Sequence, residues 1–96
     1  MALERLEVPA TGDLAGLGEL RAALLARLEA GQPAYLDARH VDEPSAALIQ
    51  LIEAAAAAFG EKSLGFGLVE PSDALCAGYE TIGLFAQLMS RIAMDS

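Results

Sequence analysis

Short apolar runs alternate along this chain with longer segments of helical periodicity, and this alternation limits the folds open to it. Runs of strand length occur at Leu6–Val8, Pro33–Asp37 and Leu64–Val69. Each is followed by a segment in which apolar residues recur at helical spacing. Strand–helix–strand units of this kind build parallel strand pairs through helical crossovers. The sequence therefore predicts an α/β fold, with a small, mostly parallel or mixed sheet of three or four strands and helices packed against it.

Turn and cap residues predict where the helices begin and end. Asp13 is the expected N-cap of the first helix, and Gly31 fits the position just past its end. We expect the second helix to begin near Pro44 and to end at Gly60. Pro71 and Ser72 open a third helix, which Gly83 separates from a last short one. The expected apolar faces of the first three helices consist of Leu14, Leu17, Leu20, Leu24 and Leu28; of Leu48, Leu51, Ile52, Ala55 and Phe59; and of Leu75, Tyr79 and Ile82.

Composition excludes several classes of function. The 96 residues suffice for one core, so we expect a single domain over residues 1–96. A net charge of −8 would repel a phosphate backbone or an anionic lipid surface, so we expect no nucleic-acid partner and no membrane insertion. The chain has no run long enough for a membrane span and no signal-peptide pattern. The single Cys76 rules out an internal disulfide and fits a reducing compartment, which predicts a cytoplasmic location.

The connection between Asp37 and Ser45 is the most informative segment for function. It follows a short apolar strand and leads into a strongly amphipathic helix. In open α/β sheets, function gathers in the loops beyond the carboxyl ends of the strands. Ser45 lies beside a helix N-terminus, where backbone N–H groups favour an anion.

Catalytic and metal chemistry find little support in the same segment. His40 is the only histidine, and no second histidine or suitably spaced cysteine accompanies it, so we predict no metal site. As a general base for Ser45, His40 would need an orienting group and an oxyanion hole, and the sequence offers neither. The glycines of LGFGLV lack the lysine and the strand-to-helix turn of a phosphate-binding loop. We therefore predict no enzyme activity and no cofactor.

Three stretches together resemble the STAS domain, the fold of anti-sigma-factor antagonists. The helix ELRAALLARLEAG leads into the strand PAYLDA, which ends in aspartate. The stretch VDEPSAALIQLIEAA occupies the place of the family's phosphorylation loop and second helix. The stretch LGFGLVEPSDALCAGYETIGLFAQL is similar to the family's third strand, its Pro-Ser turn and a helix that breaks at a Gly-Leu pair. The resemblance covers nearly the whole chain through the order and spacing of these motifs.

This resemblance implies a protein-docking module in bacterial signalling. In partner switching, the loop and second helix bind a histidine-kinase-like or anti-sigma regulator, and a chemosensory complex is a further partner of this class. The corresponding surface here consists of His40, Asp42, Glu43, Ser45, Ala46 and Ile49. The resemblance also leaves an alternative, in which the chain is the small STAS subunit of a lipid-transport ATP-binding-cassette complex and clamps its ATPase.

Ser45 is the candidate phosphoacceptor of this surface. The family's loop ends in an aspartate followed by Ser or Thr. An alignment without gaps places Ser45 at that aspartate and Ala46 at the acceptor position, whereas a shift of one residue makes Ser45 the acceptor. A phosphate on Ser45 would meet the negative charges of Asp42 and Glu43. The other role open to Ser45 is a helix cap hydrogen-bonded to the backbone.

Overall fold

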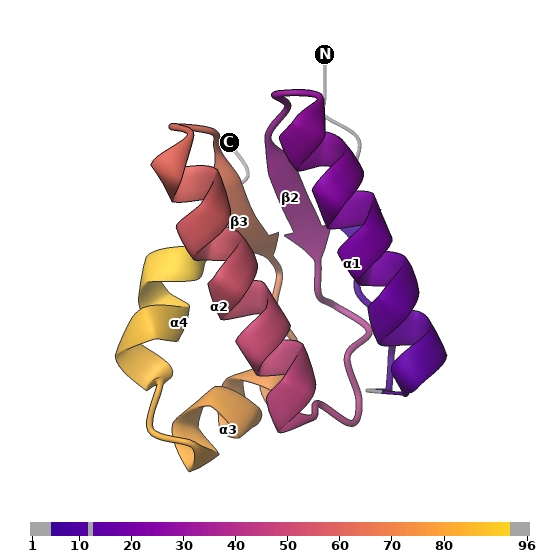
Figure 1. Cartoon of the computed structure of the whole chain (residues 1–96). Helices are drawn as coiled ribbons and strands as arrows, with labels where there is room; N and C mark the ends of the chain where they lie inside the picture. The colour runs from indigo at the N-terminus through magenta and orange to yellow at the C-terminus, as the bar shows by residue number, and fades with distance from the viewer. Residues whose placement is uncertain (1–4, 12, 93–96) are drawn as a thin grey trace.

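The computed structural model describes residues 5–11 and 13–92 of the chain (Figure 1). Strands and helices alternate, and a fourth helix follows the third. Their bounds are β1 Leu6–Glu7, α1 Leu14–Glu29, β2 Ala34–Asp37, α2 Ala46–Glu61, β3 Phe66–Val69, α3 Asp73–Thr81 and α4 Phe85–Arg91. This order confirms the predicted α/β class. The ends of the expected domain, residues 1–4 and 93–96, lie outside the described residues.

The three described strands form one parallel sheet in the order β1–β2–β3, with β2 in the centre. Leu6, Leu36 and Leu68 are aligned in register across the three strands. Their side chains pack in the hydrophobic core beneath α1 and α2, which lie side by side over one face of the sheet (Figure 1). Because side chains alternate along a strand, the neighbouring row, Glu7, Asp37 and Val69, points to the opposite face.

Each of the first three helices begins at a side-chain cap. Asp13 accepts a hydrogen bond from Gly16 N, Ser45 from Leu48 N, and Ser72 from Leu75 N. These bonds confirm Asp13 as a cap and place the third helix start at Ser72. The second helix begins at Ala46, near Pro44 as predicted. The Ser45 hydroxyl supplies its cap, which leaves Pro44 outside the helix.

Two helix ends lie at the glycines that predicted them, and a third does not. Gly31 and Gly83 adopt φ angles of 69° and 79°, which glycine tolerates without a Cβ clash, and they end α1 and separate α3 from α4. The prediction that Gly60 ends α2 was wrong. The helix runs on to Glu61, and Ser63 takes the left-handed conformation instead, at φ 56°.

The core lies between the sheet and the helices. Leu20 and Leu24 of α1, and Leu75 and Tyr79 of α3, are buried as their spacing predicted. Two residues at the ends of the predicted apolar faces are not buried. Leu14 is 88% exposed and Ile82 is 42% exposed. The buried face of α2 is also rotated slightly about the helix axis relative to the predicted face. Its buried residues are Leu48, Ile49, Ile52, Ala55 and Phe59, and Leu51 is only partly buried.

A polar cluster joins α4 to the rest of the domain. The Tyr79 hydroxyl donates a hydrogen bond to Glu53 Oε2 at 3.0 Å, and the Arg91 guanidinium binds the same carboxylate at 3.1 and 2.9 Å. Burial, with the Glu53 carboxylate as hydrogen-bond acceptor, raises the pKa of Tyr79 well above its usual value, so the phenol remains a donor. This cluster holds the end of α4 where Ile92 forms a parallel bridge with Leu68.

Truncation of a β2 core residue should destabilise the whole domain. Leu36 has 0% exposure, and Leu36→Ala should lower the free energy of unfolding by about 2–5 kcal/mol, because it removes buried methyl groups and leaves a cavity. Leu14→Ala is the matched control, since Leu14 is 88% exposed, and should change stability by less than about 0.5 kcal/mol. Urea unfolding followed by circular dichroism measures both. Equal losses in the two variants would contradict this packing.

Candidate functional site

The segment 38–45, called here the β2–α2 loop, leaves the sheet at the carboxyl end of its central strand. Its first anchor is the connection between β1 and α1. The backbone N–H groups of Asp42 and Glu43 both donate to the Ala10 carbonyl, at 2.8 and 3.0 Å. Glu43 also forms a parallel bridge with Thr11. These bonds fix the backbone of the loop on one side while the side chains of Asp42 and Glu43 remain exposed.

Ser72 anchors the loop on its other side. Its backbone N–H donates to the Ala38 carbonyl at 3.0 Å, and its hydroxyl donates to the Val41 carbonyl at 2.6 Å. The same oxygen caps α3 through Leu75 N, so one side chain joins two segments. The sequence identified Ser72 as a helix start but gave no sign of the bond to Val41, because the two residues lie 31 positions apart.

A close approach of α3 supports the end of the loop. A Cβ atom on Gly78 would lie 3.1 Å from Pro44 Cγ and 3.4 Å from Ile49 Cδ1. The absence of a side chain at Gly78 therefore lets α3 pack directly against the loop and the first turn of α2. With the hydrogen bonds of Ser72, this contact makes the loop part of the rigid scaffold.

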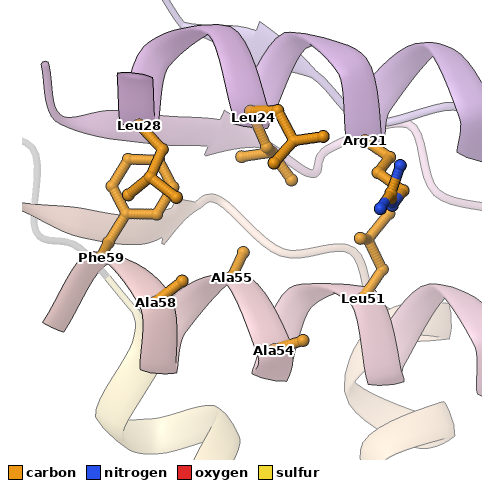
Figure 2. A pocket seen from close by; sticks show the side chains of 9 residues that line it. Arg21, Leu24, Leu28, Leu51, Ala54, Ala55, Ala58 and Phe59 are labelled. Carbon is orange, nitrogen blue, oxygen red and sulfur yellow. The ribbon is translucent and has the colours of Figure 1, made fainter. Parts of the chain in front are cut away.

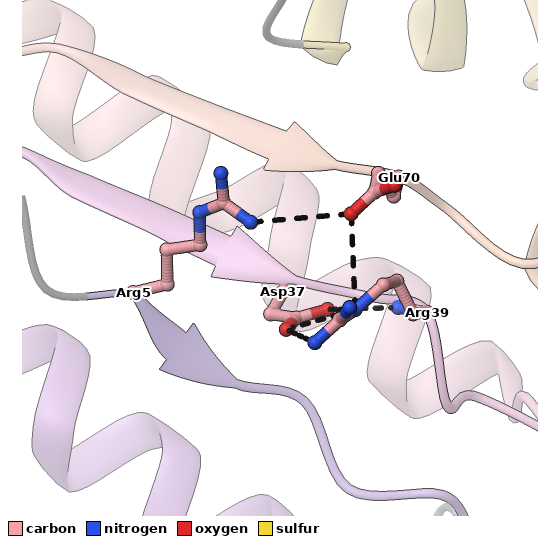
Figure 3. A network of polar contacts seen from close by, with 4 residues as sticks. All are labelled: Arg5, Asp37, Arg39 and Glu70. Carbon is pink, nitrogen blue, oxygen red and sulfur yellow. Dashed lines mark hydrogen bonds and ion pairs between the residues drawn. The ribbon is translucent and has the colours of Figure 1, made fainter. Parts of the chain in front are cut away.

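Four charged side chains form a network beside the loop (Figure 3). Arg39 binds both carboxylate oxygens of Asp37, at distances of 2.9 to 3.2 Å. Its Nε lies 3.8 Å from Glu70 Oε2, and Arg5 Nη1 lies 3.9 Å from the same atom. The Arg39 hydrogen bonds hold the pKa of Asp37 below its ordinary value of 3.8, against the opposing effect of burial. No pattern in the sequence predicts this network, although Asp37 and Arg39 lie two positions apart at the end of β2.

The residues expected to contact a partner divide into two groups. His40, Asp42, Glu43 and Ala46 are exposed, and Ser45 is half-buried. Ile49 is 2% exposed, because it packs in the core beneath the first turn of α2. Ile49 therefore supports this surface from below, and its side chain is not presented to a partner. We call the exposed set His40, Asp42, Glu43 and Ala46 the loop surface.

The hydroxyl of Ser45 is engaged in a helix cap. Its oxygen accepts a hydrogen bond from Leu48 N at 3.1 Å, which satisfies one of the N–H groups that a helix leaves unpaired at its start. Ser45 as a whole is only partly buried. The cap role is thus a direct feature of the fold, whereas the phosphoacceptor role stays a prediction.

The described residues offer little for metal or thiol chemistry. Within residues 5–11 and 13–92, no group of three His, Cys, Asp or Glu side chains is placed to hold a metal ion. Burial raises the pKa of the partly buried Cys76 thiol, which lowers the fraction of reactive thiolate. Across the same residues, no helix is both long enough and apolar enough to cross a membrane.

Comparisons with protein-family models, curated proteins and solved structures give no match for this chain.

The Asp37–Arg39 contact should make stability depend on acid pH. The folded-state pKa of Asp37 lies below 3.8, so the unfolded chain takes up the proton first as the pH falls. The contribution of Asp37 to the free energy of unfolding is complete above its unfolded pKa and is lost as the pH falls through the folded pKa. Asp37→Asn should thus be less stable than the parent near neutral pH, and the difference should shrink below pH 3.8. Urea unfolding across this range measures it.

Asp42→Asn is the control for this experiment. It removes an exposed carboxylate of the neighbouring β2–α2 loop, and this carboxylate accepts no hydrogen bond from a described residue. It should leave the acid dependence close to that of the parent. A difference in the free energy of unfolding between the parent and Asp37→Asn that stays constant from neutral to strongly acid pH would contradict the role given to Arg39.

Proposed function

We propose that this chain is a STAS-like, non-enzymatic docking module in bacterial cytoplasmic signalling. Its partner is a histidine-kinase-like or anti-sigma regulator, or a chemosensory complex. Binding takes place at the loop surface and the start of α2. The observation that carries this proposal is the anchoring of the β2–α2 loop on both sides, by Ala10 and by Ser72, while its charged side chains remain exposed.

Rigidity of the loop supports a role in binding. A flexible loop loses conformational entropy when a partner orders it, and that loss lowers affinity. Here the backbone of Asp42 and Glu43 is already hydrogen-bonded, and Val41 between the two anchors is 2% exposed. The bound conformation therefore needs little further ordering.

The charge of the loop surface indicates the kind of partner surface that fits it. Arg39 is paired with Asp37, and neither Asp42 nor Glu43 forms an ion pair with any residue that the structure describes. Two unneutralised carboxylates on a chain of net charge −8 favour a basic surface on the partner. Ala46 beside them presents only a methyl group, which allows the partner to approach the helix start closely.

Charge reversal at the loop surface should weaken docking. We expect the variant Asp42→Lys/Glu43→Lys/Ala46→Trp to bind its partner at least about tenfold more weakly, because it replaces attraction by repulsion and blocks the helix start. The tagged chain is used to isolate partners from the native cell, mass spectrometry identifies them, and titration with the purified partner gives the affinity. An ATPase in place of a regulator would favour the transport-complex alternative over this proposal.

Glu19→Lys/Glu80→Lys is the matched control for this docking experiment. Both glutamates are exposed, on α1 and α3, and their reversal changes the net charge by the same amount as reversal at Asp42 and Glu43. It should retain most of the affinity. Equal binding by the loop variant and the parent chain would refute the assignment of this surface.

Phosphorylation of Ser45 is a separate part of the proposal. A phosphate at the cap would add roughly −1.5 to −2 charges beside Asp42 and Glu43 and would change both the helix start and the docking surface. Incubation with the partner kinase and ATP should raise the intact mass by one phosphoryl group, and Ser45→Ala should prevent this. Ser90→Ala is the control, since Ser90 is exposed on α4 and its hydroxyl bonds to Ala86 O within that helix, and it should still be modified. A modified Ser45→Ala protein would exclude Ser45 as the acceptor.

A further inference from the structure

The outer face of α2 carries no exposed charge over most of its length. Its exposed residues between Ala46 of the loop surface and the final residue are Ala47, Gln50, Ala54, Ala57 and Gly60. The helix has two carboxylates: Glu53 is bound by Arg91 and Tyr79, and Glu61 is the final residue. A helix that faces water ordinarily has charged or polar residues on that side. This face is therefore suited to being covered.

A shallow apolar groove runs between α1 and α2 on the same side of the domain (Figure 2). Arg21 and Leu51 lie at one end, and Leu28 and Phe59 lie at the other. The volume of the groove is about 180 Å³. Sites for small molecules usually measure roughly 300–1,000 Å³, so this groove suits inserted aliphatic side chains better than a whole ligand.

Three exposed residues of α1 form a ridge beside this groove. Arg21, Leu25 and Glu29 are four positions apart, which places them along one packing ridge of the helix. At 1.5 Å per residue, the two charged residues lie about 6 Å on either side of Leu25 along the helix axis. Neither Arg21 nor Glu29 forms an ion pair within the part of the chain that the structure describes. The adjacent exposed positions are Gly18, Ala22 and Ala26, whose small side chains allow another helix to come close.

We infer that this ridge and the groove beside it bind a second copy of the chain, in an antiparallel two-fold contact centred on Leu25. A two-fold rotation perpendicular to α1 reverses the order of the ridge. Arg21 of each copy then lies opposite Glu29 of the other. The two Leu25 side chains meet at the axis, beside the small residues and the grooves of the two copies. The surface is self-complementary, as an isologous contact requires.

Charge favours this face over other contacts between copies. Each chain has a net charge of −8, so two chains that meet at random acidic surfaces repel each other. On the Leu25 ridge, each copy contributes one positive and one negative charge, and antiparallel packing pairs both. The loop surface does not take part in this contact, so dimerisation and partner docking use separate faces of the domain.

Charge exchange at the ridge tests the inference. Sedimentation velocity over a concentration series should show a reversible dimer of the parent chain. Arg21→Glu and Glu29→Arg should each weaken it about tenfold or more, because like charges then face each other twice. The double variant Arg21→Glu/Glu29→Arg should restore the dimer. A mixture of the two single variants should form mixed dimers, since the four charges again pair.

Glu80→Arg is the control, because it makes the same charge change as Glu29→Arg on α3, outside the ridge, and should dimerise like the parent. Circular dichroism verifies that each variant is folded. A parent chain that stays monomeric at every concentration would overturn the inference. So would a double variant that dimerises no better than the single ones.

Discussion

Hydrogen bonding of β2 to a parallel neighbour on each side is the constraint on which the rest of this structure depends. The pairings Leu6 with Leu36 and Leu36 with Leu68 align three leucines beneath the helices. Because the strands are parallel, their carboxyl ends meet at one edge. The chain must then return along the helices each time, which places the loop after β2 and the turn after β3 together at that edge. The contacts of Ser72 with Ala38 and Val41 follow from this arrangement.

Much of the fold could be predicted because it follows from local chemistry. The caps at Asp13 and Ser72 and the left-handed turns at Gly31 and Gly83 depend on residues close in sequence. The error at Gly60 is also local, since α2 continues by one residue to Glu61 and Ser63 takes the left-handed conformation. The position of the loop could likewise be anticipated from the strand that precedes it.

The details of the site depend on contacts between distant residues and could not be predicted. No local pattern shows that Ala10 accepts two hydrogen bonds from the loop, or that Arg5 and Arg39 approach the same carboxylate of Glu70. The burial of Ile49 is a similar case. Helical periodicity allowed it either a core or a surface position, and packing beside Gly78 places it in the core. Sequence therefore predicted a set of candidate residues after the central strand, and tertiary contacts determine which of their side chains are exposed.

Because Gly78 has no side chain, a substitution there would change the shape of the loop surface without changing its charge. Even a methyl group there would press on Pro44 at 3.1 Å, yet Gly78 itself lies outside the loop surface. A change at this one position alters the outline of the surface while every exposed charge and hydroxyl of the loop stays the same. The shape of the loop surface and its charge thus depend on different residues in this protein.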